Sequence, residues 1–182
     1  VSVRKSQFAL QFIRVLGCNW MSLEISVASP KDVPSIVNLI RMGIKERAFH
    51  NREVSVEGYL EYAFDDRQKG FNLFICQIED EIVGYIDSLV GRWGVGHISG
   101  IYVRPEHRRK GIGGLLMERI LDRFRMDDCH KARLEVFADD QGAIKFYSRC
   151  EFVQEGYLQK DEARRDIVIM SRFLEVTEEN SF

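Results

Sequence analysis

The sequence predicts a single mixed α/β domain, on three observations. Its 182 residues are close to the common size of one domain and can bury a core without disulfides or a metal. Segments with the period of a strand alternate along the chain with segments that have the period of a helix. The chain shows no internal repeat and no low-complexity linker that would divide it. The predicted order of elements is β-α-α-β-β-β-α-β-α-β.

The first predicted strand covers residues 23–27, where apolar and polar residues alternate. A helix follows, because Ser29 can cap it, Pro30 suits its first position and Asp32 completes a variant capping box. Its apolar face carries Val33, Ile36, Val37, Ile40 and Ile44. A second helix is predicted over residues 56–64, and the helical region ends near Gly70.

The next segments read as a hairpin, with strands over 71–78 and 82–90 around the turn 79–81. The remaining predicted elements are a turn over 91–96, a strand over 98–103, a helix over 113–126, a strand over 133–137, a short helix over 141–149 and a closing strand over 167–173.

Composition excludes several classes of protein. Hydrophobic residues make up 45% and charged residues 30%, which is ordinary for a globular protein and argues against disorder or a membrane protein. The formal net charge of −2 provides no global basic field, so we expect no nucleic-acid partner, and any anion site must be built locally.

Four cysteines, Cys18, Cys76, Cys129 and Cys150, show neither a CxxC pair nor the spacing of a zinc site. We therefore expect no metal and reduced thiols, which suit a cytoplasmic location. Cys76 lies in an apolar run and is interpreted as a core residue.

Residues 1–20 are interpreted as an N-terminal extension. They carry Arg4, Lys5 and Arg14 and no acid, but the apolar run is too short for a membrane span or a secretory leader. Met21-Ser22 resembles a second start, so the extension is a translated upstream stretch, an expression remnant or a genuine arm. The domain is predicted over 21–175, followed by a short acidic tail over 176–182.

Basic residues and glycines are concentrated between the predicted strand 98–103 and the helix that follows it. Three glycines within residues 111–114 let the backbone turn tightly and approach a ligand, and the first N–H groups of the helix lack partners within it. Arg108, Arg109 and Lys110 add positive charge at the same end. The segment therefore predicts a pyrophosphate site. The dinucleotide-binding pattern fails because Leu116 occupies its third glycine position, and the P-loop pattern is absent.

The run Arg108-x-x-Gly111-x-Gly113, with Val103-Arg104-Pro105-Glu106 before it and Leu115-Leu116 after it, closely resembles the acetyl-CoA signature of the GNAT superfamily of N-acetyltransferases. The similarity extends over residues 21–173. It implies a mixed sheet whose central strands, ending at Val103 and Phe137, splay apart to admit the pantetheine arm.

The resemblance also implies the residues that meet acetyl-CoA. Backbone amides from Arg109 to Gly114 would hold the pyrophosphate, and an N–H within 101–103 would stabilise the thioester oxygen. The implied coenzyme-binding residues are Ile101, Tyr102, Val103, Arg108, Arg109, Lys110, Gly111, Ile112, Gly113, Gly114, Asp140, Ala143 and Tyr147.

Residues 134–147 resemble a second GNAT segment, in which Glu135 would be the base and Tyr147 the general acid. Aminolysis of a thioester needs a neutral amine, so a base is required near pH 7. Two departures weaken the match: Asp140 replaces the usual Asn, and Glu151 replaces the Gly before the last hairpin. Non-catalytic roles stay open for both residues: Glu135 as an outward-facing carboxylate of a strand, and Tyr147 as a core residue. His97 is an alternative base.

The leading hypothesis is acetyl transfer to a primary amine of a peptide N-terminus, a lysine or a small molecule. The alternative is a module that binds acyl-CoA without turnover. The segment 155–160 lacks the paired tyrosines with which related peptide acetyltransferases grip a peptide, which favours small amines. Acidic residues in the region of the first two predicted helices either attract a polycation or are merely solvated: Glu46, Glu53, Glu57, Glu61, Asp65 and Asp66. The expected partners are acetyl-CoA and an amine, with no membrane; a homodimer is compatible with the sequence.

Overall fold

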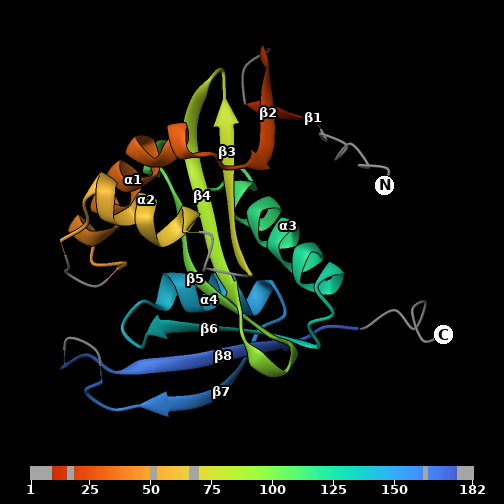
Figure 1. The fold of residues 1–182 in the computed structure, drawn as a ribbon. Coiled ribbons are helices and arrows are strands. Elements are labelled where there is room, and N and C mark those ends of the chain that lie inside the picture. The colour runs from red at the N-terminus through yellow and green to blue at the C-terminus, as the bar shows by residue number, and fades with distance from the viewer. Residues whose placement is uncertain (1–9, 16–18, 50–52, 66–69, 162–163, 176–182) are drawn as a thin grey trace.

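The computed structural model describes residues 10–15, 19–49, 53–65, 70–161 and 164–175. They form one eight-stranded sheet in the order β1-β2-β3-β4-β5-β6-β8-β7, with helices on both faces (Figure 1). Neighbouring strands are antiparallel except β5 and β6, which are parallel. The mixed α/β class predicted from the sequence is confirmed.

The strands are β1 (Leu10–Val15), β2 (Asn19–Val27), β3 (Phe71–Ile78), β4 (Glu81–Val90), β5 (Val95–Val103), β6 (Lys131–Phe137), β7 (Val153–Leu158) and β8 (Ile167–Phe173). The helices are α1 (Val33–Lys45), α2 (Val56–Phe64), α3 (Ile112–Met126) and α4 (Gln141–Arg149), and short 3-10 turns cover Pro30–Asp32, Arg92–Gly94 and Pro105–His107. None of the helices in the described part of the chain is long and apolar enough to cross a membrane.

The two faces of the sheet carry two separate cores. On one face the apolar sides of α1 and α2 pack over Leu73, Tyr85 and Tyr102. On the other face α3 packs over Phe74 and Ile86, and residues of α4 border the same core. Since successive side chains of a strand point to opposite faces, each strand of the centre contributes to both cores.

Serine residues stand before the first two helices, and the sequence predicted the one at Ser29. Ser29 donates to the Asp32 carboxylate from its backbone N–H at 2.8 Å and from its hydroxyl at 2.7 Å, just before α1. The Ser55 hydroxyl accepts from the Gly58 N–H at 3.0 Å and caps α2. Further along α2, Tyr59 donates to Asp87 of β4 at 2.9 Å, which fastens the helix to the sheet.

The strands β1 and β7 were not predicted from the sequence, and the predicted starts of β2, β5 and β6 lie after the observed ones. The side chains of β7 lie mostly exposed, and its pairing with β8 is interrupted by a bulge between Gln154 and Gly156, so no regular apolar alternation marks it. The strand β1 falls inside the predicted N-terminal extension, and the predicted tail 176–182 lies outside the described residues.

Candidate active site

The glycine-rich loop between β5 and α3 is an open turn. Arg109 and Gly111 both have left-handed backbone angles, with φ of 62° and 86°, which bends the chain into the first turn of α3. A Cβ added to Gly111 or Gly114 would meet no described atom within 4 Å. The space in front of these backbone amides is therefore open to a ligand, as a pyrophosphate site requires.

The third glycine of the loop has a different role. A Cβ on Gly113 would lie 3.3 Å from the Phe146 ring of α4, so this glycine allows α3 and α4 to approach each other closely. Ile112, next to it, is buried in the core beneath α3. Only part of the glycine signature is therefore explained by ligand access, and the rest by packing.

The cations of the loop are not equivalent. Arg109 is exposed and Lys110 half-buried, whereas the Arg108 side chain turns back to bind protein atoms. Its Nε donates to the Val103 carbonyl at 2.8 Å and its Nη2 to Glu46 at 2.6 Å. The sequence grouped Arg108 with the phosphate-binding cations; the structure gives its guanidinium protein partners.

β5 and β6 separate at their carboxyl ends. Their parallel pairing runs from Val95 opposite Lys131 to Ile98 opposite Leu134, and within the described residues no pairing between them follows. The change coincides with a bulge at Ser99, where the register between β4 and β5 shifts. Beyond it β5 pairs with β4, and β6 pairs with β8.

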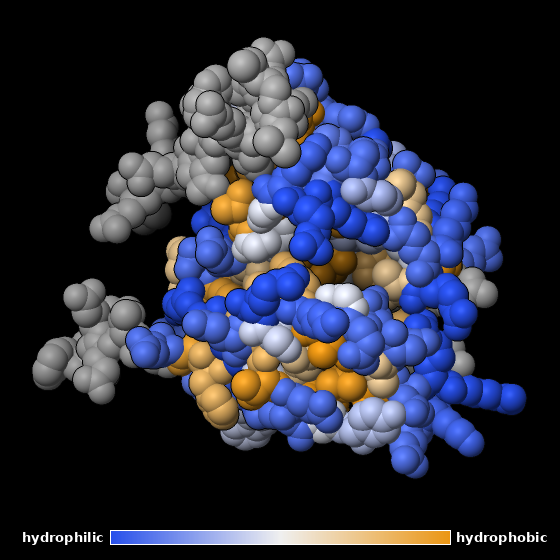
Figure 2. Space-filling model, turned by 180° about the vertical axis from the view of Figure 1, so that it is seen from behind, coloured by the Kyte–Doolittle hydropathy of each residue, from blue (hydrophilic) through white to orange (hydrophobic). Residues whose placement is uncertain are grey.

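This separation leaves Ile101, Tyr102 and Val103 at an edge of β5 that faces no paired strand of the described chain. Alternate residues of an antiparallel strand direct their N–H and C=O groups to opposite sides, so some of these groups point into the gap. Figure 2 shows a hollow with apolar walls on the face of the molecule opposite to that of Figure 1.

Tyr147 lies on the inner side of α4, on the face of the sheet covered by α3. Its ring packs against Phe146 and Phe152 at centroid distances of 5.3 and 6.3 Å. Burial, with smaller contributions from the Asp140 and Cys150 charges, raises the pKa of Tyr147 well above its ordinary value of 10.0. The hydroxyl therefore stays protonated and able to donate.

Asp140 holds the start of α4, because its Oδ1 accepts from the Ala143 N–H at 2.9 Å. An Asp caps a helix as well as the Asn that the sequence comparison expected there. The departure from the usual residue therefore preserves the local structure, while it adds a negative charge beside the end of β6.

Glu135 lies on the other face of the sheet. The core-facing residues of β6 are Ala132, Leu134 and Val136, which pack with α3, so Glu135 points away from α3 and is exposed. Glu135 and Tyr147 therefore lie on opposite faces of the sheet.

His97 is close enough to Glu135 to sense its charge. Burial and the neighbouring Arg133 lower the pKa of His97 from 6.5, and Glu135 opposes the shift. The imidazole is therefore neutral near pH 7, although the lowered pKa makes it a weaker base than an ordinary histidine.

Two residues outside the predicted site also border it. Glu46, at the end of α1, binds Arg108, and Arg165, before β8, donates to Asp139 at 2.5 Å. The sequence placed Glu46 among acids that either attract a polycation or are solvated. No local pattern marks Glu46 or Arg165, because their partners are 62 and 26 residues away.

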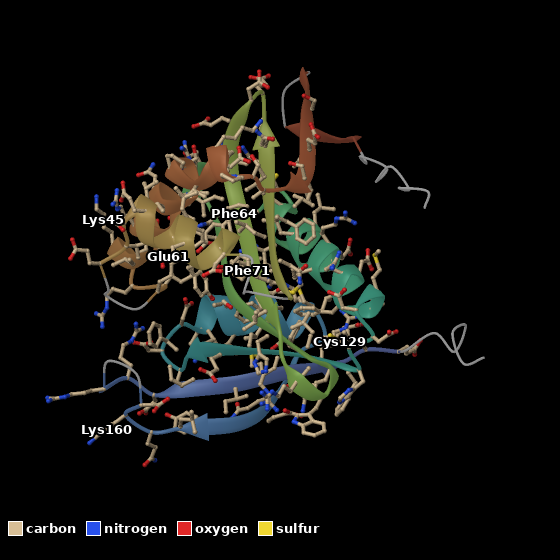
Figure 3. The ribbon with its side chains drawn as sticks, in the orientation of Figure 1. Lys45, Glu61, Phe64, Phe71, Cys129 and Lys160 are labelled. Atoms are coloured by element: carbon tan, nitrogen blue, oxygen red, sulfur yellow. The ribbon has the colours of Figure 1, made fainter. Side chains whose placement is uncertain are left out.

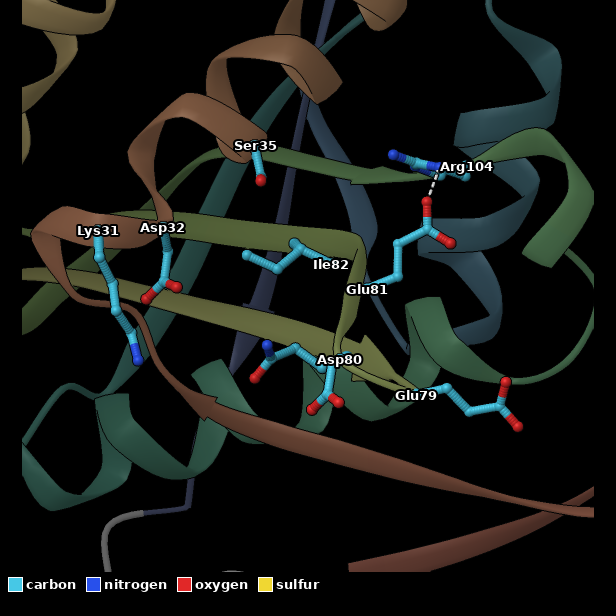
Figure 4. Close-up of a pocket in the computed structure, with 9 residues that line it drawn as sticks. Lys31, Asp32, Ser35, Glu79, Asp80, Glu81, Ile82 and Arg104 are labelled. Atoms are coloured by element: carbon cyan, nitrogen blue, oxygen red, sulfur yellow. Dashed lines mark hydrogen bonds and ion pairs between the residues drawn. The ribbon is translucent and has the colours of Figure 1, made fainter.

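A separate pocket of about 480 Å³ lies by the start of α1 and the β3–β4 turn (Figure 4). Its lining includes Lys31, Asp32, Asp80 and Arg104, and Arg104 forms an ion pair with Glu81. None of the predicted site residues lines it. Among the described residues, no group of three His, Cys, Asp or Glu side chains could hold a metal ion.

Comparison with known proteins agrees with this geometry. The family model of the acetyltransferase (GNAT) family matches residues 41–152. An N-alpha-acetyltransferase of Saccharolobus solfataricus is 30% identical over 141 residues, which cover 67% of this chain and 82% of the relative. A spermidine N(1)-acetyltransferase of Vibrio cholerae is 31% identical over 87 residues, covering 43% and 50%.

The crystal structure of a ribosomal-protein-alanine N-acetyltransferase from Brucella melitensis superposes with a TM-score of 0.75 at 20% identity, over 82% of this chain and 99% of that one. At this identity the likeness concerns the fold. The match of the family model over more than half of the chain places this protein in the GNAT acetyltransferase family. It is an acetyl-CoA-dependent N-acetyltransferase.

Proposed function

We propose that the enzyme transfers the acetyl group directly to a primary amine across the gap between β5 and β6. The observation that carries this proposal is the end of the pairing between β5 and β6 after Leu134, which is followed by the exposed Glu135, while Tyr147 packs on the face of the sheet that carries α3. In this proposal the amine enters from the Glu135 face and the thiol leaves on the Tyr147 face.

In this proposal the loop from Arg109 to Gly114 holds the pyrophosphate with its backbone amides, helped by the N-terminus of α3. Asp140 and Ala143, at the start of α4, border the pantetheine arm. An N–H among Ile101, Tyr102 and Val103 donates to the thioester oxygen as negative charge develops there.

Each of the two proton transfers is assigned to the residue on one face of the sheet. Glu135 accepts a proton from the amine, whose nitrogen forms a bond to the acetyl carbon while the bond from that carbon to sulfur breaks. Tyr147 donates its proton to the departing thiolate, which leaves as the neutral thiol. Glu135 then releases its proton to solvent and the Tyr147 phenolate takes one up, so both residues return to their starting states. The raised pKa of Tyr147 keeps that proton on the hydroxyl near neutral pH.

For the acceptor we propose a peptide or protein N-terminus. Two carboxylates near the entrance, Glu46 and Asp139, are already paired with Arg108 and Arg165, which reduces the negative charge available to a polyamine. Beyond Leu134, the edge of β6 that faces the gap offers main-chain groups to an extended peptide.

A thiol-release screen tests both parts. N-terminal peptides, polyamines, aminoglycosides and free amino acids are compared at two salt concentrations, with Glu135→Gln beside the wild type. We expect salt-insensitive release with peptides that Glu135→Gln greatly reduces. Salt-sensitive thiol release with a polyamine and none with peptides would reject the peptide acceptor. If none of the amines supports thiol release, catalysis is rejected in favour of a binding module.

A further inference from the structure

The last turn of α1 contacts both halves of the active site, and Glu46 lies at its centre. One carboxylate oxygen of Glu46 accepts from the Tyr102 hydroxyl at 2.9 Å, and the other accepts from Arg108 Nη2 at 2.6 Å. Tyr102 belongs to the splayed strand β5, and Arg108 opens the phosphate loop. A single side chain of α1 therefore binds two separate parts of the coenzyme site.

Arg108 is held from three sides. Besides the bond to Glu46, its Nε donates to the Val103 carbonyl at 2.8 Å, and its guanidinium lies 5.1 Å from the centre of the Tyr102 ring. Because Arg108 directly precedes Arg109, whose left-handed backbone starts the loop, fixing its side chain restricts where the loop amides point.

The Tyr102 hydroxyl stays protonated and can therefore donate to Glu46. Burial, and then its hydrogen bond to Glu46, raise the pKa of Tyr102 to about 12. Its ring also packs 6.1 Å from that of Phe49, in the segment that follows α1. The position of β5 and that of the chain after α1 are therefore linked through one tyrosine.

The same turn reaches the other half of the site. The Arg47 carbonyl accepts from Arg165 Nη1 at 3.1 Å, and the Arg165 guanidinium lies 3.3 Å from the centre of the Phe137 ring at the end of β6. In Figure 3 the end of α1, marked by Lys45, and the β7–β8 turn, marked by Lys160, lie on the same side of the molecule. Residues 46 and 47 thus join the phosphate loop to the entrance for the amine.

We propose that Glu46 is a positioning residue that couples the binding of acetyl-CoA to the binding of the amine. A coenzyme bound at the loop favours the one position of Arg108 that Glu46 holds, and Glu46 in turn fixes the turn of α1 next to Arg165. By linkage, each ligand then raises the affinity for the other. The acceptor half of this inference rests on the proposed function, whereas the coenzyme half rests on the family alone.

The ion pair between Glu46 and Arg108 is partly exposed, with 35% and 42% of the side-chain surfaces accessible. Pairs of this kind contribute little to the free energy of unfolding. Removing the Glu46 charge should therefore change ligand binding much more than it changes the melting temperature.

The test compares Glu46→Gln with the wild type and with Glu118→Gln, a matched control on an exposed position of α3. Calorimetric titration gives the Kd of acetyl-CoA without turnover, and steady-state kinetics with the best amine of the screen give KM and kcat. We expect Glu46→Gln to raise both the Kd of acetyl-CoA and the KM of the amine about tenfold, with kcat within about threefold of the wild type. Glu118→Gln should change none of them.

Two further variants keep the inference testable if Glu46→Gln does not fold. Tyr102→Phe removes one donor to Glu46 and should raise the Kd in the same direction by a smaller factor. Arg108→Gln should match Glu46→Gln, and the double variant should be no worse than either single one, because the two residues act as a pair.

An unchanged Kd in Glu46→Gln, or additive effects in the double variant, would overturn the coupling. So would a kcat lowered a hundredfold at unchanged Kd, which would mean that Glu46 acts on the reacting atoms. If no amine supports thiol release although acetyl-CoA binds, the proposed function fails, and the Kd comparison still decides the role of Glu46 at the coenzyme.

Discussion

The coenzyme half and the acceptor half of this active site are built from different materials. In the proposed site the coenzyme half is a continuous stretch from β5 into α3, whose backbone amides would hold the pyrophosphate. The proposed acceptor half consists of side chains from the end of α1, the end of β6 and the segment before β8. A site made of backbone leaves a contiguous motif in the sequence, whereas a site made of distant side chains leaves none.

The largest expected effect concerns the coenzyme half. Gly111→Val should abolish the rise in melting temperature that acetyl-CoA causes, because Gly111 has φ of 86° and a Cβ there would enter the space for the phosphates. With the wild type, micromolar affinity gives about 2.7 kcal/mol of stabilisation at a hundredfold excess over Kd.

Gly114→Ala is the companion variant. Gly114 faces the same open space, but it lies in the first turn of α3 and alanine adds a single methyl group, so the coenzyme-induced shift should fall less than in Gly111→Val. Gly114→Ala should also stabilise the free protein by about 0.5–1 kcal/mol, as alanine does in helices. An undiminished shift in Gly111→Val would contradict the assignment of the loop.

Tyr147→Phe separates chemistry from coenzyme binding. We expect kcat to fall about a hundredfold, the usual value of general acid catalysis, with the Kd of acetyl-CoA nearly unchanged. Because the pKa of Tyr147 is raised, the wild-type rate should show no alkaline decline from this residue up to about pH 10. Wild-type turnover in the Phe variant would make Tyr147 a core residue only.

Glu135→Gln examines the acceptor half. Loss of the base should lower kcat/KM at pH 7 about tenfold to a hundredfold, because most of the amine is then protonated. The difference should narrow as pH rises and the neutral amine becomes abundant. A pH-independent ratio between variant and wild type would instead indicate that Glu135 only binds the acceptor.

The smallest effect concerns His97, beside Glu135. Its pKa is lowered in the folded protein, so the unfolded chain binds more protons at pH values just below 6.5. The free energy of unfolding should therefore rise with pH through that window and level off above it. His97→Gln should flatten the rise in chemical denaturation series; an unaltered slope would show that another group causes it.

The sequence predicted much of the frame. The bounds of α2, α4, β3 and β8 agree with the predictions to the residue, since each strand is a mostly buried apolar run and each helix has an apolar face and a capping residue before it. The strand β7 escaped notice, because its exposed side chains and the bulge before Gly156 erase the alternation.

The site, like the frame, has parts that the sequence predicted and parts that it did not. The loop around Gly111 follows from the motif and from helix-end chemistry, and its open geometry agrees with that reading. The roles of Glu135 and Tyr147 stay predictions. The pairing of Glu46 with Arg108 could not be predicted, because it depends on a fold that brings residues 62 positions apart within 2.6 Å.

The central claim is that acetyl-CoA lies along the loop after β5 and enters the gap between β5 and β6. Amide hydrogen exchange with and without acetyl-CoA, and with ATP in place of it, tests this most directly. We predict that acetyl-CoA slows exchange in segments 101–114 and 138–147 and leaves the β3–β4 turn unchanged, and that ATP has no such effect. Protection confined to the β3–β4 turn, or equal protection by ATP, would contradict the account.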